Sequence, residues 1–248
     1  MTVPDEISPA APPVPAKRAG LWEDFIDIFV SPSEVFERRR DANFFPALLV
    51  FVVLTTIIFF VARPVMQAVF DSEFARATAA AMRKNPQITA AQMEKGRGFA
   101  EKFQVVGVVV GSFFLPMVVG VILWIAGKLV SARENIGQAC LIATYAMFPR
   151  LIEGVINAVQ GFLLDPSTLN GRYRLTLGLG RFFDPDTVSP ILLAVVGRID
   201  IFTIWVTVLL AIGLSVIGRI PRSRAAIAAA AVWVIGMLPG LWGALRAS

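Results

Sequence analysis

The sequence contains no histidine, a single cysteine and few charged side chains. Its 248 residues include 23 lysines and arginines and 18 aspartates and glutamates, so charged residues make up only 17% of the chain. Without histidine the chain lacks the commonest general base and the commonest zinc ligand. The single cysteine, Cys140, cannot form an intrachain disulfide. Because the sequence also has no nucleophile motif or phosphate-binding loop, we expect neither an enzyme nor a bound metal or cofactor.

Hydrophobic residues account for 56% of the chain, and the mean hydropathy is +0.69. Soluble domains usually contain about 45–50% apolar residues. A helix needs roughly 20 apolar residues to cross about 30 Å of hydrocarbon. The sequence therefore predicts an all-α polytopic membrane protein in contact with the lipid bilayer. Its five transmembrane helices are expected at residues 44–62, 105–127, 136–164, 199–217 and 225–245.

The net charge of +5 is mild, and the basic residues gather at the ends of apolar runs. This placement is typical of residues that set the orientation of a membrane protein, and it argues against a nucleic-acid-binding surface. Three consecutive arginines occupy residues 38–40, and a basic loop covers residues 219–224. The positive-inside rule then predicts a cytoplasmic N-terminus and, after five spans, an outside C-terminus. Arginines in the 165–189 loop oppose this orientation. The absence of a signal peptide and the Ala/Val/Arg-rich composition favour a bacterial plasma membrane.

The chain divides into three parts by composition. Residues 1–20 are rich in proline and alanine and predict a disordered tail. Residues 21–41 predict two short amphipathic helices on the cytoplasmic side. Residues 42–248 predict the five-span membrane domain.

The amphipathic pattern of residues 21–30 places Trp22, Phe25, Ile28 and Phe29 opposite Glu23, Asp24 and Asp27. Such a helix either lies in the membrane interface or packs on the helix bundle, and the pattern fits both arrangements. Ser31 and Glu34 form a capping-box pattern around Pro32, which predicts the start of a second short helix.

The first two spans are expected to continue beyond the bilayer as a helical hairpin. Asn85-Pro86 breaks the first helix, and Thr89 with Gln92 forms a capping-box pattern that opens the second. The hairpin residues are mixed in charge, which favours a solvated spacer over a binding site. In the second span, Gly107 and Gly111 form a small-xxx-small pair, which allows close helix approach but is a weak signal because it is frequent in such sequences.

Polar residues interrupt the third span and the start of the fourth. Pro149 should bend or open the third span. The candidate intramembrane polar network comprises Arg150, Glu153, Asn157, Gln160, Arg198 and Asp200. In one interpretation the pairs Arg150–Glu153 and Arg198–Asp200 lock the bundle, because buried ions need partners. In the other, these residues line a track for an ion, a proton or a lipid headgroup.

The order of four stretches resembles the Yip1 family of five-span membrane proteins, in its bacterial branch. The most specific is Asp-Ile-Phe-Thr-Ile-Trp at residues 200–205, followed by Ala-Ile-Gly-Leu at 211–214. The others are residues 25–36, 85–92 and 145–149. The resemblance implies an all-helical bundle with a cytoplasmic N-terminus. Eukaryotic relatives are linked to vesicle traffic and bind small GTPases of the Rab type, whereas the bacterial branch has no settled activity.

Together these features predict a non-catalytic integral membrane protein that organises the membrane or binds a partner through residues 21–41. The alternative is a small transporter or channel that uses the polar track between the third and fourth spans. Either role is compatible with a homo-oligomer or with a subunit of a larger membrane complex.

Overall fold

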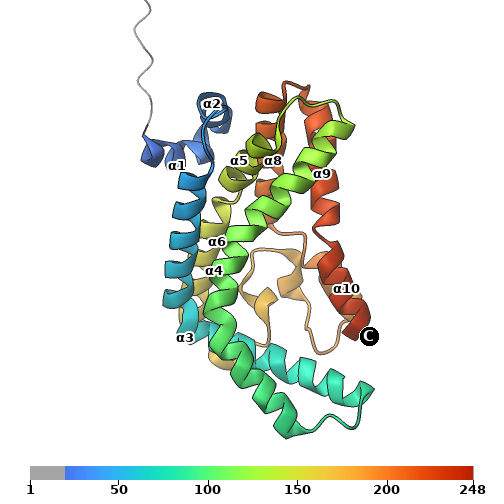
Figure 1. Cartoon of the computed structure of the whole chain (residues 1–248). Helices are drawn as coiled ribbons and strands as arrows, with labels where there is room; N and C mark the ends of the chain where they lie inside the picture. The colour runs from blue at the N-terminus through green and yellow to red at the C-terminus, as the bar shows by residue number, and fades with distance from the viewer. Residues whose placement is uncertain (1–19, 248) are drawn as a thin grey trace, which may run out of the picture.

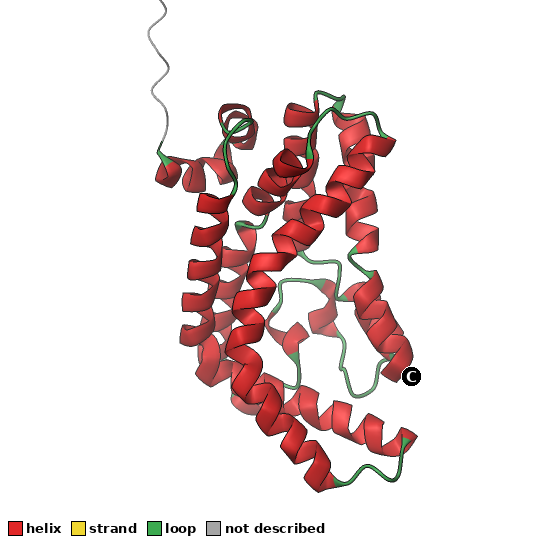
Figure 2. Ribbon diagram, viewed as in Figure 1, coloured by secondary structure: helices red, strands yellow, loops and turns green. Residues whose placement is uncertain are grey.

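The computed structural model describes residues 20–247, which form helices joined by loops (Figures 1 and 2). The predicted disordered tail falls outside the described residues apart from Gly20. The elements are α1 (Leu21–Val30), α2 (Pro32–Arg38), α3 (Phe45–Lys84), α4 (Ala90–Leu129), α5 (Ile136–Ala146), α6 (Pro149–Leu163), the 3-10 helices η1 (Pro166–Thr168), η2 (Arg172–Leu175) and η3 (Leu179–Phe182), α7 (Pro190–Val196), α8 (Ile201–Gly218), α9 (Arg222–Ile235) and α10 (Leu238–Ala247).

Within residues 20–247, five helical segments are long and apolar enough to cross a membrane. They are Phe45–Lys84, Ala90–Leu129, Ile136–Leu163, Ile201–Gly218 and Arg222–Arg246. No named strand occurs in this part of the chain, where the only extended pairing is an isolated bridge between Gly178 and Asp200. The prediction of an all-α, multi-pass membrane protein is therefore confirmed.

Helices α3 and α4 are each 40 residues long. At 1.5 Å per residue, each measures about 60 Å, or twice the thickness of the hydrocarbon core. Their far halves turn aside together and reach beneath the 165–189 loop toward α10 (Figure 1). The predicted capping box opens α4: the Gln92 backbone N–H donates to Thr89 Oγ1 at 3.3 Å, and the Thr89 N–H donates to Gln92 Oε1 at 2.9 Å.

The two ends of the bundle differ. The N-terminal end carries α1, α2 and the loops at residues 130–135 and 219–221 (Figure 1). The hairpin end carries the tip of the α3–α4 hairpin, the 165–189 loop and α10. Lys84 Nζ at the hairpin tip donates to the Arg246 carbonyl of α10, which ties the hairpin to the C-terminal helix.

Helix α5 lies at the centre of the core, and residues 139–146 are all buried. It packs against α4 and α8. A Cβ built on Gly120 of α4 would lie 2.7 Å from the Cys140 Cα, so the absence of a side chain there lets the two backbones approach closely. Nothing in the described chain lies within 4 Å of a Cβ built on Gly107 or Gly111, so the close approach that this pair allows is not used there.

The third span is interrupted as the sequence predicts. Helix α5 ends at Ala146, and α6 begins at Pro149 after two turn residues. Proline has no N–H to donate and fits the first position of a helix, so the chain restarts there. The fifth span has a second interruption, between α9 and α10, where Gly236 and Met237 form the turn.

Helix α1 packs on the bundle through Phe25 and Ile28. Trp22, however, is 72% exposed, whereas Asp24 is fully buried, so the predicted face assignment is wrong for these two residues. Helix α2 begins at Pro32 as expected, but the Ser31 side chain makes no capping hydrogen bond, and that capping-box prediction is wrong.

Candidate functional site

Two helix starts meet at the centre of the candidate polar network. Helix α6 starts at Pro149 and carries Arg150 in its first turn. Helix α8 starts after Asp200, whose Oδ1 accepts hydrogen bonds from the backbone N–H groups of Phe202 at 2.9 Å and Thr203 at 2.8 Å. This arrangement leaves Arg150 Nη1 3.8 Å from Asp200 Oδ1. The structure therefore brings one predicted residue of the third span to one of the fourth.

The Arg150 guanidinium is held on three sides. Its Nη1 donates to Glu153 Oε2 at 2.6 Å, and its Nη2 donates to Thr203 Oγ1 at 2.7 Å. The Thr203 hydroxyl in turn donates to Asp200 Oδ2. One guanidinium thus faces two carboxylates in a continuous hydrogen-bonded chain, which offsets the cost of placing charge at membrane depth. This network fastens α6 to α8.

Arg198 does not belong to that network. No ion pair joins it to Asp200 among the described residues, so the expected Arg198–Asp200 pair is wrong, because Asp200 instead caps α8 and faces Arg150. The Arg198 Nε is buried and has no hydrogen-bond partner. Burial and the nearby Arg150 guanidinium lower the pKa of Arg198, and the Asp200 carboxylate opposes them only in part. Its Nη2 lies over Gly236, where a Cβ would collide with it.

The remaining two predicted residues lie farther along α6. Gln160 Nε2 donates to the Leu175 carbonyl at 2.8 Å, and its Oε1 accepts from Arg181 Nη2 at 3.5 Å. It therefore ties α6 to the 165–189 loop rather than to the fourth span. Asn157 Oδ1 is buried without a hydrogen-bond partner. The hydrogen bonds of the described residues thus join Arg150, Glu153 and Asp200, whereas Gln160 binds elsewhere.

A second charged centre, absent from the sequence predictions, lies where α1, α2 and α5 meet. The buried Asp24 carboxylate accepts from Arg38 Nε at 2.6 Å and also from Arg39 Nε. The Tyr145 hydroxyl of α5 donates to the same carboxylate at 3.4 Å. Arg38 also binds Asp27. The three arginines at residues 38–40, at the end of α2, were the signal that could have predicted this centre. Arginines beside apolar helices need acidic side chains nearby.

Glu134, in the loop between α4 and α5, was also missed. Its side chain is fully buried, and neither carboxylate oxygen has a hydrogen-bond partner. A Cβ on Gly218 would lie 2.9 Å from its Oε2, and one on Gly127 would overlap its Oε1. Lys128 Nζ donates instead to the backbone carbonyls of Ala132 at 3.2 Å and Glu134 at 2.5 Å. Burial raises the pKa of Glu134.

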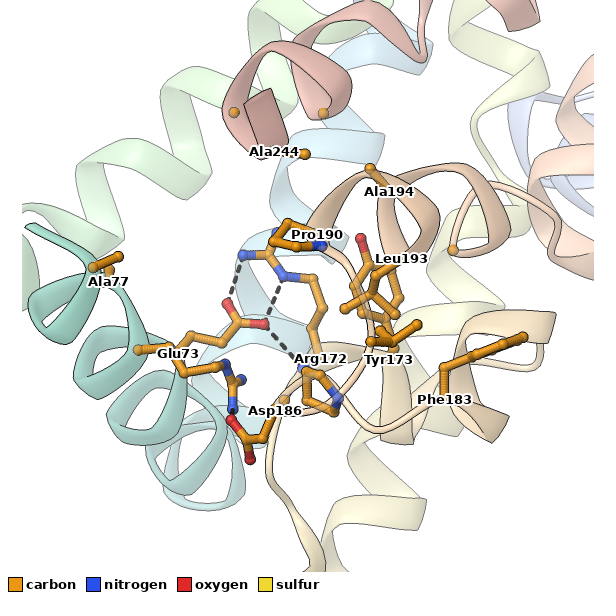
Figure 3. Close-up of a pocket in the computed structure, with 18 of the residues that line it drawn as sticks. Glu73, Ala77, Arg172, Tyr173, Phe183, Asp186, Pro190, Leu193, Ala194 and Ala244 are labelled. Atoms are coloured by element: carbon orange, nitrogen blue, oxygen red, sulfur yellow. Dashed lines mark hydrogen bonds and ion pairs between the residues drawn. The ribbon is translucent and has the colours of Figure 1, made fainter. Parts of the chain in front are cut away.

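Two cavities lie on the side of the bundle formed by α9 and α10. The first, of about 1010 Å³, is the arginine-lined cavity, which lies between α3, the 165–189 loop, α7 and α10. Figure 3 shows Arg172 reaching from the loop to Glu73 on α3, with Pro190 and Leu193 of α7 beside it. The hydrogen bond to Glu73 raises the pKa of Arg172. The second, of about 860 Å³, is the apolar cavity between α4, α8, α9 and α10.

The described residues contain no group of three or more His, Cys, Asp or Glu side chains that could hold a metal ion. A family model described as the Yip1 domain matches residues 26–243, which is most of the chain. No curated protein matches the chain, and no solved structure matches it.

Proposed function

The chain belongs to the Yip1 family, and on that premise we propose that it is a non-catalytic membrane-organising protein that binds a protein partner through residues 21–41. The five apolar segments make it a multi-pass membrane protein in contact with lipid. We further propose that it lies in a bacterial plasma membrane, with the N-terminal end cytoplasmic and the C-terminus outside.

The orientation is supported by the position of the basic residues. Arginines at the end of α2 lie at the N-terminal end together with the loops that follow α4 and α8. Arg133, Arg219 and the arginines that open α9 belong to those short loops and helix starts. Short loops rich in arginine and lysine remain on the cytoplasmic side. This gathering at one end supports a cytoplasmic α1–α2 unit.

One observation carries the partner-binding proposal: α1 has an apolar stripe that nothing in the described chain covers. Trp22, Ile26 and Val30 are 72%, 69% and 73% exposed. Residues four apart lie on the same face of a helix, so these three side chains form one line. The opposite face of α1 is fixed to the bundle through Asp24 and Phe25, and the Phe25 ring stacks on Phe148 with centroids 4.7 Å apart. The stripe is therefore presented in a fixed orientation.

A photo-crosslinking side chain at position 26 tests the proposal. We expect a crosslink to a defined protein partner, and we expect the double variant Trp22→Ser/Val30→Ser to lose that product while remaining folded. Glu23→Gln, an exposed change on the same helix, is the matched control. Crosslinking to lipid alone would instead show that the stripe inserts into the membrane interface, and the partner-binding proposal would fail.

The second candidate is a small transporter or channel that uses the polar track. Its support is that Arg150 and Thr203 line the apolar cavity. The hydrogen-bonded lock between α6 and α8 favours the structural interpretation. We expect Glu153→Gln and Asp200→Asn to lower the yield of folded protein. If both variants are folded in the membrane but abolish a flux measured in liposomes, the organising role is wrong.

A further inference from the structure

The arginine-lined cavity and the apolar cavity adjoin. Arg198, Gly236 and Pro239 line both of them. These residues gather at the turn between α9 and α10 and at the start of the segment that leads into α8. Arg198 is thus the charged side chain that the two linings share, with an arginine-lined space on one side and a mostly apolar space on the other. Such a pair of spaces fits an amphipathic ligand.

The arginine-lined cavity has an excess of positive charge. Its lining includes two carboxylates, Glu73 and Asp186, and five arginines at positions 76, 83, 172, 174 and 198. Both carboxylates are already engaged: Glu73 binds Arg172 through two guanidinium nitrogens, and Asp186 lies 3.3 Å from Arg76. A concave surface with unbalanced arginines attracts anions, and phosphate oxygens match the guanidinium fork.

Arg198 is the residue shared by both linings that has an unsatisfied buried donor. Its Nε is buried without a partner, and no ion pair reaches it from the described residues. The nearest carboxylate in sequence, Asp200, is occupied by the backbone of α8 and by Thr203. A buried donor without an acceptor is costly. A phosphate in the cavity would accept hydrogen bonds from the part of the Arg198 guanidinium that lines it and would supply a negative charge beside the buried Nε.

Exposed apolar side chains of two membrane-spanning segments line the apolar cavity. Leu115 and Val118 of α4 line one wall and are each 52% exposed. Trp242 and Leu245 of α10 line the opposite wall and are also exposed. Its volume of about 860 Å³ lies within the roughly 300–1,000 Å³ of known ligand sites. An acyl chain can therefore enter from the bilayer, which a free soluble anion would not require.

We propose that the paired cavities bind an anionic glycerophospholipid, with its phosphate on Arg198, its headgroup in the arginine-lined cavity and an acyl chain in the apolar cavity. The site lies toward the hairpin end, away from the α1 stripe, and does not depend on the proposed partner binding. The lipid would fill the space beside the turn between α9 and α10 and hold these two half-helices in place.

The test uses the full chain, purified in a neutral detergent and mixed with phosphatidylglycerol or with zwitterionic phosphatidylcholine of the same acyl chains. Native mass spectrometry measures how much of each lipid the protein retains. We expect preferential retention of phosphatidylglycerol, and a loss of about tenfold in apparent affinity for Arg198→Gln, as one charge-assisted contact implies. Equal retention of both lipids by the unmodified chain would overturn the proposal.

Two further variants separate the site from general charge. Arg133→Gln removes the same charge from an exposed position at the N-terminal end and should retain phosphatidylglycerol unchanged. Gly236→Ala keeps every charge but pushes the Arg198 guanidinium aside, so it should weaken retention even if Arg198→Gln does not fold. If Gly236→Ala and Arg133→Gln behave alike, Arg198 is not the contact. If glycerol 3-phosphate displaces the lipid at equal concentration, the ligand is a soluble anion and the lipid assignment is wrong.

Discussion

Replacing Asp24 by asparagine should release α1 and α2 from the bundle. The Asp24 carboxylate is fully buried and receives Arg38 Nε at 2.6 Å, Arg39 Nε and the Tyr145 hydroxyl. Asparagine keeps the shape of the side chain but removes its charge. Two guanidinium groups would then face a neutral amide that also places an N–H₂ donor beside them, so the variant loses two ion pairs and gains a repulsive contact.

The magnitude follows from burial. Removing one partner of a buried ion pair costs about 3–5 kcal/mol. The Arg38 and Arg39 side chains are 28% and 22% exposed, so water can partly replace the lost carboxylate around both guanidinium groups. We therefore expect the lower end of that range, about 3 kcal/mol. Asp27 provides a matched control, because it is 32% exposed and pairs with Arg38 alone. Asp27→Asn should cost no more than about 1 kcal/mol.

Limited trypsin digestion in detergent measures the release, because the bonds after Arg38, Arg39 and Arg40 lie in the segment that Asp24 holds. A destabilisation of about 3 kcal/mol raises the open population by roughly a hundredfold, and cleavage should accelerate accordingly. The transmembrane helices should stay intact in the same sample. Equal cleavage of Asp24→Asn and Asp27→Asn would refute the reasoning, since it would mean that burial of Asp24 contributes nothing.

Two other positions give predictions of the same kind. Gly120→Ala places a Cβ 2.7 Å from the Cys140 Cα, so it should separate α4 from α5 and lower stability in detergent by about 1–3 kcal/mol. Gly107→Ala, where nothing lies within 4 Å of the new Cβ, should not lower the melting temperature, because alanine favours a helix over glycine. Equal losses of stability would contradict the assigned contact. Burial raises the pKa of Glu134 above its unfolded value of about 4.3, so the folded state binds the proton more tightly than the unfolded state does. The stability of the fold should therefore fall as pH rises from the unfolded pKa through the folded pKa. Glu134→Gln should remove this dependence, and melting curves at pH 4 and pH 8 check it.

Features that depend on one segment at a time were predictable from the sequence. The five spans follow from apolar run length, and the start of α4 follows from Thr89 and Gln92, because a capping box needs only residues three apart. The break before Pro149 follows from a missing N–H. Each of these is decided by local covalent chemistry or by the thickness of the bilayer.

Features that depend on how helices cross were not predictable. The spacing of apolar residues in α1 predicts a helix, but the positions of α2 and α5 decide which face of that helix is buried. For this reason Asp24 is buried and Trp22 is exposed. Similarly, small residues at Gly107 and Gly111 permit close packing without requiring it. The actual contact, at Gly120, depends on where α5 begins and on the angle at which it crosses α4.

The arrangement of carboxylates around α6 and α8 explains why Arg198 lacks a partner. A helix N-terminus carries a partial positive charge and favours an acidic residue in its first turn. Asp200 satisfies this need for α8, and Glu153 lies near the start of α6. Both carboxylates also face Arg150. Asp200 thus caps the start of α8, both carboxylates face one guanidinium, and neither of them forms an ion pair with Arg198. An anion bound in either of the two cavities that Arg198 lines would supply the ion pair that the described residues leave unformed, as the lipid proposal requires.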